Sequence, residues 1–254
     1  MYPLEVKALS KYFGGIRAIE EITFHTKYKT VLSIIGPNGA GKTTLFNCLT
    51  GFMRPSKGSI IFSGKNISGL SSDRINRLGI ARTFQNIRLF KDMTVLENVM
   101  VAQHSKIRSG LFSAILRPPL FLKEEKTVRE KGYEYLELLR LEDHADKISG
   151  SMPYGAQRRL EIARALATEA SLLLFDEPTA GMNPLETDEM MKTIRCLKEL
   201  DKTVILIEHD MKFVMGISDR IIVLDHGVKI AEGVPQEIKS NPMVIEAYLG
   251  KETH

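Results

Sequence analysis

Four short runs of apolar residues stand out along the chain, and residues typical of turns bound each of them. The runs are continuous rather than alternating, and three of the four are rich in β-branched residues, so we expect strands that are buried on both faces. Strands of this kind form a parallel sheet that helices cover on both sides. The four runs are Val31–Ile35, Leu172–Phe175, Val204–Ile207 and Ile221–Leu224.

Apolar residues at helical spacing lie between these runs. After the first run, Leu45, Cys48, Leu49 and Phe52 recur at positions i, i+3, i+4 and i+7, which predicts one buried helical face. A second set with similar spacing comes before the Leu172 run and comprises Leu160, Ala163, Leu166 and Ala167. This alternation of strands and helices indicates a doubly wound α/β architecture.

The beginning and the middle of the chain follow other patterns. Strand-like pieces at Leu4–Leu9, Ile22–Thr26 and Ser59–Phe62 are separated by glycine turns, and we interpret them as an antiparallel edge layer. Residues 87–150 contain no convincing strand before their end. They do contain one helical face (Val128, Gly132, Tyr135, Leu136 and Leu139) and a break at Arg117-Pro118-Pro119. We expect a helical subdomain at 87–150, inserted into a core formed by 1–86 and 151–254.

Composition narrows the class of protein. The chain has 254 residues, of which 43% are hydrophobic and 26% charged, so it suits one globular core with or without a subdomain. A net charge of +4 is too small to indicate nucleic-acid binding. Cys48 and Cys196 match no metal or disulfide pattern, so we expect both to be packing residues in a reducing compartment. No signal peptide or span-length apolar run is present, so a second chain would have to cross any membrane involved.

One segment fits the phosphate-binding pattern G-x-x-x-x-G-K-[ST]. It follows a predicted strand and opens a predicted helix, which is the context that this pattern requires. Backbone N–H groups of such a loop surround phosphate oxygens, and the helix N-terminus adds partial positive charge. We expect Lys42 to reach the β- and γ-phosphates of a bound nucleotide, and Thr43 to hold Mg²⁺. The segment comprises Gly36, Pro37, Asn38, Gly39, Ala40, Gly41, Lys42, Thr43 and Thr44.

Two adjacent carboxylates, Asp176 and Glu177, follow the Leu172 run. Open α/β sheets bind ligands at the carboxyl ends of their strands. We therefore expect Asp176 to hold Mg²⁺, directly or through water, and Glu177 to polarise the attacking water. The alternative is that the Asp-Glu pair merely ends a strand and starts a turn before Pro178. Because the chain also carries a phosphate-binding loop, we favour the functional explanation.

A third segment, Met152–Arg159 followed by Leu-Glu-Ile-Ala-Arg-Ala, resembles the signature motif and helix of the ABC transporter ATPase family. Other P-loop families lack this element. The resemblance implies a P-loop NTPase fold with a RecA-like core, an antiparallel β layer and an inserted α-helical subdomain. It also implies that Tyr154 and Gly155 contact the γ-phosphate of ATP bound to the opposite subunit, so that two subunits close around two nucleotides.

Other positions match motifs of this family in the family's own order. Phe13 matches the aromatic residue that stacks on adenine, with Tyr12 as its rival. Gln85 matches the glutamine that touches Mg²⁺ and water, and His209 the switch histidine that senses the γ-phosphate. Ala180–Asn183 matches the loop that crosses the dimer interface. Taken singly, Phe13 could be a core aromatic residue, Gln85 a surface glutamine and His209 a structural histidine. Their common order favours the functional interpretation.

The chain departs from the family's pattern at two places. The commonest signature is Leu-Ser-Gly-Gly-Gln, and here Pro153 replaces the serine and Ala156 the last glutamine. Proline offers neither a hydroxyl nor an N–H group, so we expect this half-site to be weakened but active. Asn183 stands where the interface loop usually ends in aspartate, which keeps hydrogen bonding but removes a charge.

Longer segments narrow the resemblance to one branch of the family. They look like the ATP-binding subunits of bacterial and archaeal branched-chain amino-acid importers, and the likeness covers nearly the whole chain. Other subunits select the cargo, and relatives in this branch handle amides and urea, while the lipopolysaccharide-export ATPase is a nearby rival. The segments include Asn47–Phe52, Gly79–Phe90 and Tyr154–Ala165.

The resemblance also implies partners and roles. It implies ATP and Mg²⁺, transmembrane permease subunits, a second ATP-binding subunit that is identical or different, and indirectly a substrate-binding protein. It places the chain at the cytoplasmic face of the inner membrane and implies no nucleic acid. Catalysis would involve Lys42, Gln85, Glu177 and His209, and the metal would be held by Thr43, Gln85 and Asp176.

Two other classes of protein compete with this interpretation. An ABC ATPase of DNA repair or translation usually carries paired cassettes, coiled coils or zinc modules, and this sequence has none of them. A nucleotide kinase or GTPase would account for the P-loop alone. It would leave the carboxylate pair, the signature helix and His209 unexplained.

Overall fold

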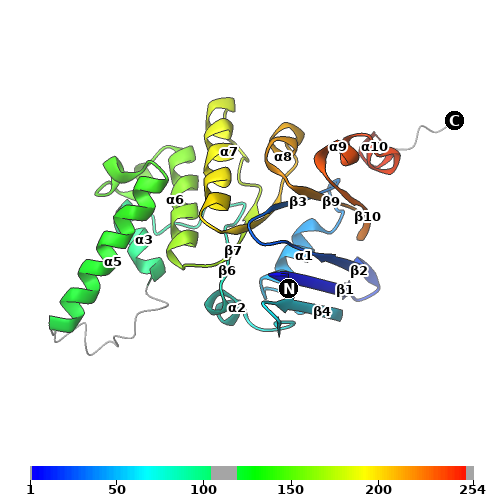
Figure 1. Cartoon of the computed structure of the whole chain (residues 1–254), viewed down its shortest axis with the longest axis horizontal. Coiled ribbons are helices and arrows are strands. Elements are labelled where there is room, and N and C mark those ends of the chain that lie inside the picture. The colour runs from blue at the N-terminus through cyan, green and yellow to red at the C-terminus, as the bar shows by residue number, and fades with distance from the viewer. Residues whose placement is uncertain (1, 104–118, 250–254) are drawn as a thin grey trace. The chain divides into compact units, whose positions relative to one another are not determined.

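The computed structural model describes residues 2–103 and 119–249, and the chain divides into two compact units. Met1–Gln85 and Ser171–His254 form one unit, which we call the core unit. Asn86–Ala170 form the other, which we call the helical unit. Figure 1 shows the elements of each.

A six-stranded sheet forms the centre of the core unit, with its strands in the order β10-β9-β3-β8-β7-β6. All neighbours pair in parallel except β10, which is antiparallel to β9. Every residue of β3, β7 and β8 is buried, as the continuous apolar runs predict. The strands are β3 (Val31–Ile35), β6 (Ile80–Arg82), β7 (Leu172–Asp176), β8 (Thr203–Ile207), β9 (Arg220–Asp225) and β10 (Val228–Gly233).

A second, antiparallel sheet has the order β2-β1-β4-β5. The turn from β1 to β2 passes through Gly14, which has a positive φ of 56° that favours glycine. The strands extend beyond the predicted pieces, so that Phe13 lies at the end of β1 beside this turn. They are β1 (Leu4–Phe13), β2 (Ile16–His25), β4 (Lys57–Phe62) and β5 (Lys65–Asn66).

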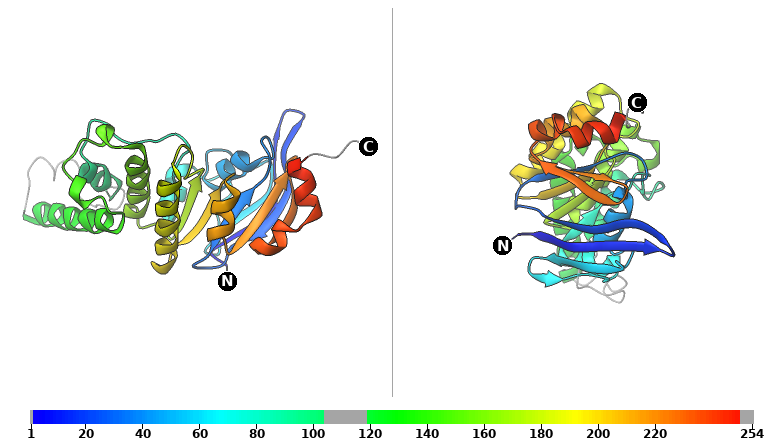
Figure 2. Two further views of the ribbon diagram at one scale, coloured as in Figure 1. Left: turned by 90° about the horizontal axis from the view of Figure 1, so that it is seen from above. Right: turned by 90° about the vertical axis from the view of Figure 1, so that its right-hand side faces the viewer.

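Helices complete the layers of the core unit. In Figures 1 and 2, α7 to α10 lie on one side of the parallel sheet, while α1 and the antiparallel sheet lie on the other. This arrangement buries both faces of the central strands. The helices are α1 (Lys42–Leu49), α2 (Ser72–Leu78), α7 (Pro184–Glu199), α8 (Met211–Ile217), α9 (Pro235–Lys239) and α10 (Pro242–Leu249).

The helical unit contains α3 (Val95–Gln103), α5 (Pro119–Leu138) and α6 (Tyr154–Ala167), with two short 3-10 turns between α5 and α6. Helix α5 crosses α3 closely at Gly132, where a Cβ atom would lie 2.9 Å from Leu96 Cδ1. Because α6 packs on both of these helices, the unit continues to Ala170 rather than ending at residue 150. Residues 117 and 118 of the predicted proline break lie outside the described residues, and Pro119 begins α5.

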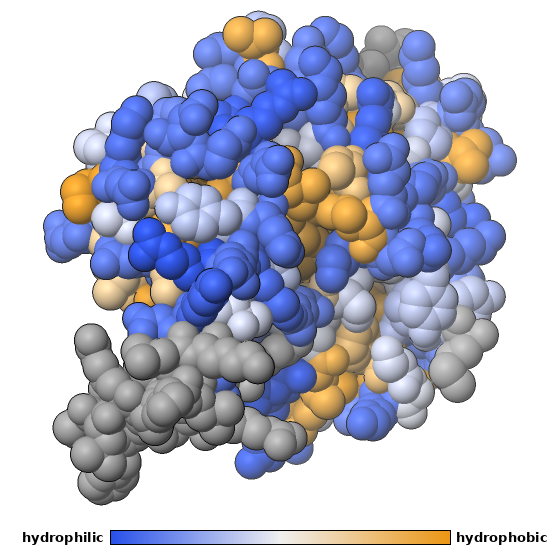
Figure 3. Space-filling view, turned by 60° about the vertical axis from the view of Figure 1, so that its left-hand side comes forward, coloured by the Kyte–Doolittle hydropathy of each residue, from blue (hydrophilic) through white to orange (hydrophobic). Residues whose placement is uncertain are grey.

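The surface seen in Figure 3 is covered mostly by hydrophilic side chains, with apolar side chains gathered in separate patches. Among the described residues, the helices are too short or too polar for any of them to span a bilayer.

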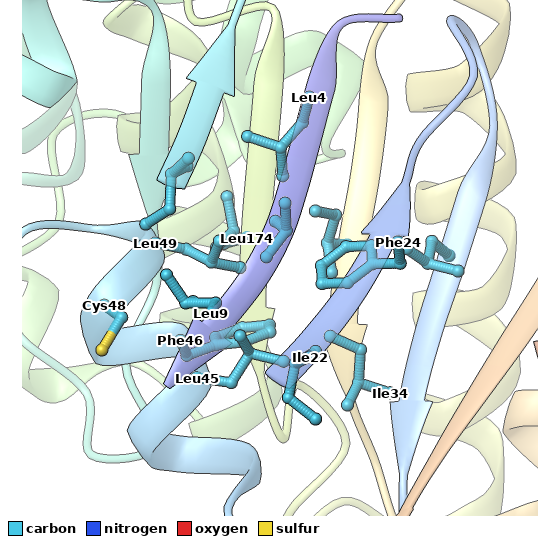
Figure 4. Close-up of a cluster of buried hydrophobic side chains, with 14 of the residues drawn as sticks. Leu4, Leu9, Ile22, Phe24, Ile34, Leu45, Phe46, Cys48, Leu49 and Leu174 are labelled. Carbon is cyan, nitrogen blue, oxygen red and sulfur yellow. The ribbon is translucent and has the colours of Figure 1, made fainter. Parts of the chain in front are cut away.

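The main hydrophobic core fills the space between the antiparallel sheet, α1 and one face of the parallel sheet. Figure 4 shows Leu4 and Leu9 from β1, Phe46 and Leu49 from α1, and Leu174 from β7 meeting there. A smaller cluster covers the other face of the sheet under α8, α9 and α10. The α/β fold with an antiparallel layer is therefore as the sequence predicts.

The position predicted for Phe52 is wrong. Helix α1 ends at Leu49, and Gly51 follows it with a φ of 74°. The apolar spacing therefore continues past the last turn of the helix. The Phe52 side chain is 50% exposed, and its ring packs edge-on against Phe84 at a centroid distance of 5.4 Å.

Candidate functional site

The phosphate-binding loop connects β3 to α1, and its backbone demands glycine at two positions. A Cβ atom on Gly36 would lie 2.0 Å from Leu224 O, and one on Gly41 would lie 2.6 Å from Ala18 O. Both glycines also have positive φ values, 148° and 97°. Gly41 is the N-cap of α1 and makes no side-chain cap hydrogen bond, so no side chain occupies the first N–H groups of this helix there.

A pocket of about 550 Å³ lies over this loop. Lys42 lines this pocket. Its Nζ donates hydrogen bonds to Gly36 O at 2.7 Å and to Pro37 O at 2.9 Å. Burial lowers the pKa of Lys42, while the charges of Glu177 and Asp176 oppose that shift. The pocket is lined by Ile16, Arg17, Ala18, Asn38, Gly39, Ala40, Gly41, Lys42, Thr43, Thr44, Glu177, His226 and Gly227.

Glu177 follows the last residue of β7 and is a wall of the same pocket. Its φ of 48° lies in the left-handed region, which is unfavourable for a residue other than glycine. The Glu177 N–H donates to Ile207 O at 3.0 Å, which fixes this backbone to the neighbouring strand β8. The strand end thus delivers a carboxylate to the phosphate-binding loop.

Two further predicted residues meet this carboxylate. Gln85 Nε2 donates to Glu177 Oε2 at 2.8 Å, and His209 Nδ1 lies 3.9 Å from the same oxygen. The histidine side chain is largely exposed, and 3.9 Å is too long for a hydrogen bond. The core unit therefore brings together three side chains that are far apart in the sequence.

Asp176 has a different environment from its neighbour. Its side chain is 8% exposed, and its Oδ2 lies 2.6 Å from Nη2 of Arg82, whose side chain is 6% exposed. Arg82 ends β6, next to β7 in the sheet. The sequence analysis did not single out Arg82. The available signal was a charged residue directly after Ile80 and Ala81 on a short buried strand.

Glu208 is a second residue that the sequence analysis missed. Its carboxylate is fully buried and accepts hydrogen bonds from the N–H and hydroxyl of Thr179, from His209 N at 2.9 Å and from Asp210 N at 3.3 Å. It thereby joins the loop after Glu177 to the residue His209. An acidic residue directly after a wholly buried strand was the signal that could have identified it.

The expected adenine side of the site lies near the β1–β2 turn. Phe13 is exposed, with Lys11 Nζ 5.0 Å from its ring centroid. Tyr12 lines a hollow of about 270 Å³ together with Gly14, Gly15, Arg17, Glu20 and Lys57. Arg17 lines both this hollow and the larger pocket. The choice between Phe13 and Tyr12 as the stacking residue stays a prediction.

The signature region begins α6 in the helical unit. Pro153 is the N-cap and makes no side-chain cap hydrogen bond. Gly155 is buried, and Tyr154 is exposed with its hydroxyl accepting a 2.9 Å hydrogen bond from Nη2 of Arg158. Arg158 is itself buried and paired with Glu161 at 3.0 Å. Burial raises the pKa of Glu161, and its hydrogen bonds and the charge of Arg158 oppose that shift.

Asn183 has a local role that the interface prediction did not include. It is the N-cap of α7, and its side chain accepts a 3.0 Å hydrogen bond from Glu186 N. The Glu186 carboxylate accepts a 3.0 Å hydrogen bond from Asn183 N in return, which completes a capping box.

Comparisons with known proteins agree with this geometry. A family model described as "ABC transporter" matches residues 19–180, and one described as "Branched-chain amino acid ATP-binding cassette transporter" matches residues 228–254. The high-affinity branched-chain amino acid transport ATP-binding protein LivG of Salmonella typhimurium is 47% identical, covering 98% of each chain. BraF of Pseudomonas aeruginosa, described in the same words, is also 47% identical with the same coverage.

Solved structures give the same result. An ATP-binding cassette of an ABC transporter in its ADP conformation is 33% identical, with a TM-score of 0.86 over 99% of this chain and 100% of the other. A dimeric cassette bound to ADP and Pi is 26% identical, with a TM-score of 0.77 over 91% of this chain and 98% of the other. These likenesses confirm the resemblance and the fold class that the sequence predicts. The chain therefore belongs to the ATP-binding family of ABC transporters, within its branched-chain amino acid group.

Proposed function

We propose that this chain binds ATP with Mg²⁺ at the pocket over residues 36–44 and hydrolyses it to drive import of branched-chain amino acids through separate permease subunits. One observation carries the proposal. The carboxylate of Glu177 is a wall of the same pocket as Lys42 and Thr43, and Gln85 donates a hydrogen bond to it. A phosphate-binding loop and a candidate base therefore face one another.

The loop recognises the phosphates by charge and by backbone N–H groups. Lys42 Nζ is bonded to two carbonyl oxygens of its own loop, and phosphate oxygens are stronger acceptors for an ammonium group. The free N–H groups at the start of α1 add donors and partial positive charge. A nucleotide without its γ-phosphate would lose part of these contacts.

The residues expected to hold the metal suit Mg²⁺. Thr43, Gln85 and Asp176 offer hydroxyl, amide and carboxylate oxygens, which are the ligands that Mg²⁺ prefers. In residues 2–103 and 119–249, no three His, Cys, Asp or Glu side chains form a metal cluster, which suits an ion held mainly by phosphates and water. Thr43, Gln85 and Asp176 would hold the ion, and bound Mg²⁺ would supply positive charge that offsets the charge of the phosphates.

Hydrolysis depends on positioning within this pocket. The Glu177 carboxylate accepts a hydrogen bond from the attacking water and orients it, while the Gln85 amide restrains the carboxylate. His209 lies beside that oxygen and can donate a hydrogen bond to the γ-phosphate. Glu208 restrains the backbone of His209, so the histidine is held although its side chain is exposed.

The partners are proposed from the relatives. We infer that a second ATP-binding subunit, identical or different, supplies its Tyr154–Gly155 region to this nucleotide. The dimeric cassette among the structural relatives supports this arrangement. Permease subunits would anchor the pair at the cytoplasmic face of the inner membrane, and a substrate-binding protein would act indirectly.

Gel filtration of the Glu177→Gln variant tests the proposal. We expect a dimer with Mg-ATP, a monomer with ADP, and hydrolysis reduced by about a hundredfold or more because the base is lost. Glu199→Gln, which alters an exposed carboxylate in the last turn of α7, is the matched control and should leave hydrolysis unchanged. ATP binding without a dimer would exclude self-pairing, and no ATP binding would contradict the proposal.

Reconstitution tests the cargo. Proteoliposomes containing this chain and its co-purified permease subunits should take up leucine when ATP and a substrate-binding protein are supplied. Glu177→Gln should abolish the uptake. ATP-dependent uptake of an amide or urea instead of leucine would show that the cargo assignment is wrong and leave the ATPase assignment intact.

A further inference from the structure

The side chain of Arg82 connects three separate parts of the core unit. Its Nη2 atom lies 2.6 Å from Oδ2 of Asp176 at the end of β7. Its Nη1 atom donates to Oδ1 of Asn47 on α1 at 2.7 Å, and to the hydroxyl of Thr50, just after α1, at 3.2 Å. One guanidinium group thereby ties the candidate metal ligand to the helix that follows the phosphate-binding loop.

Three aromatic rings surround this guanidinium. Its central carbon lies 5.6 Å from the ring centroid of Phe46, 5.7 Å from that of Phe52 and 5.0 Å from that of Phe84. Each distance is within the range of a cation–π interaction. The rings restrict where the guanidinium can move. They also explain why Phe52 leaves the helical core, since it forms one side of this cage.

The geometry requires arginine rather than a general positive charge. The two terminal nitrogens bond different partners, Asp176 and Asn47, at the same time. A planar guanidinium can do this, whereas a lysine ammonium at the end of a flexible chain would have to choose. The Asp176 carboxylate is almost fully buried, so its orientation depends on this partner.

The position of Arg82 in the chain adds a second link. It lies three residues before Gln85, which is bonded to Glu177 and is itself an expected metal ligand. The backbone between them is also attached to β7, because Thr83 N donates to Leu174 O at 3.0 Å. Any displacement of Arg82 would therefore be transmitted both to Asp176 and to the segment that carries Gln85.

We propose that Arg82 is a positioning residue for the divalent cation. It holds Oδ2 of Asp176, so that Oδ1 is presented to the metal or to a water bound to it, and it fixes the start of the segment that ends in Gln85. This inference rests on the proposed function, in which Asp176 and Gln85 serve Mg²⁺. Its specific consequence is that Arg82 affects metal affinity in the nucleotide complex more than nucleotide affinity itself.

Manganese binding measures this directly. Mn²⁺ replaces Mg²⁺ as an electron paramagnetic resonance probe and is titrated into the Glu177→Gln protein saturated with ATP. ATP affinity is measured separately in EDTA. The test variant is Arg82→Lys, which keeps the buried charge but cannot bond both partners. Arg77→Lys, on the exposed side of α2, is the matched control.

We expect Arg82→Lys to weaken Mn²⁺ binding by about tenfold or more, the usual effect of removing a partner of a metal ligand, with ATP affinity in EDTA unchanged. Asn47→Ala, which removes the second anchor and keeps Arg82 and Asp176, should weaken Mn²⁺ binding by a smaller factor and serves if Arg82→Lys fails to fold. Unchanged Mn²⁺ affinity in a folded variant would overturn the inference. A failure of the parent protein to bind Mn²⁺ with ATP would instead contradict the proposed function.

Discussion

The carboxylate of Glu208 holds Thr179 by two hydrogen bonds, one from its N–H at 2.9 Å and one from its hydroxyl. The other carboxylate oxygen accepts from the N–H groups of His209 and Asp210. The loop after Glu177 and the backbone of His209 therefore share one buried anchor. A displacement of the loop after Glu177 would therefore also displace the backbone of His209, and the reverse.

Replacing Glu208 by glutamine should disturb both sides. The new amide would bring N–H groups against backbone N–H donors, so at least one buried donor would lose its acceptor. We expect the free energy of unfolding to fall by roughly 1–3 kcal/mol, and ATP hydrolysis to become slower. Urea denaturation and steady-state hydrolysis measure these effects, with Glu199→Gln as the control. Equal values for variant and parent would exclude an anchoring role for Glu208.

The signature position Pro153 can be tested by restoring the hydroxyl. Pro153→Ser should strengthen ATP-dependent dimerisation in the Glu177→Gln protein by about tenfold or more, since a charge-assisted hydrogen bond contributes roughly 1.5–3 kcal/mol. Pro153→Ala is the matched variant, which restores only the N–H group. Sedimentation equilibrium with ATP and with ADP gives the measurement. A serine variant that dimerises no better than the parent would argue against a weakened half-site.

The capping role of Asn183 predicts a graded effect. Asn183→Ala should lower the free energy of unfolding by about 1 kcal/mol, the typical value for losing an N-cap side chain. Asn183→Asp should preserve stability, because aspartate caps helices as well as asparagine does. Urea denaturation of the three proteins measures the difference. If alanine were as stable as asparagine, the capping box would contribute nothing.

The two cysteines should differ in reactivity. Burial raises the pKa of Cys48 to about 11, so little thiolate exists at neutral pH and reagents cannot reach it. Cys196 is only partly buried on α7 and should react first. Thiol titration of the native protein should show one fast phase that Cys196→Ser removes and Cys48→Ser leaves intact. A fast phase lost in Cys48→Ser would mean that the core around α1 opens readily.

The strands were predictable because their signal is local. A buried parallel strand needs apolar side chains on both faces, so Val31–Ile35 and Val204–Ile207 are visible as continuous runs. Glycine was equally informative at Gly36 and Gly41, where the backbone excludes any side chain. Helix ends were less visible. The apolar spacing continues to Phe52, although α1 has ended before Gly51. Position 51 requires glycine, because a Cβ atom on Gly51 would lie 2.5 Å from Leu70 O.

The site residues that the sequence did not reveal make contacts with residues far away in the sequence. Arg82 and Asp176 are 94 positions apart, and Thr179 and Glu208 are 29 apart. Neither pair follows a fixed spacing, so no local pattern shows that a charged side chain will be buried against its partner. The extent of the helical unit was also not a local property. It follows from the packing of α6 on α3 and α5, which the sequence does not display.

The left-handed backbone at Glu177 implies a conflict between folding and chemistry. Glycine would adopt a φ of 48° without steric cost, while glutamate at this place gives up roughly 1 kcal/mol. In the proposed mechanism, a Glu177→Gly chain would relieve the backbone and lose the proposed base in one step, so the most relaxed version of this turn should not hydrolyse ATP. The chain thus keeps a strained backbone at Glu177. Selection for heat resistance alone would be expected to replace this glutamate by glycine.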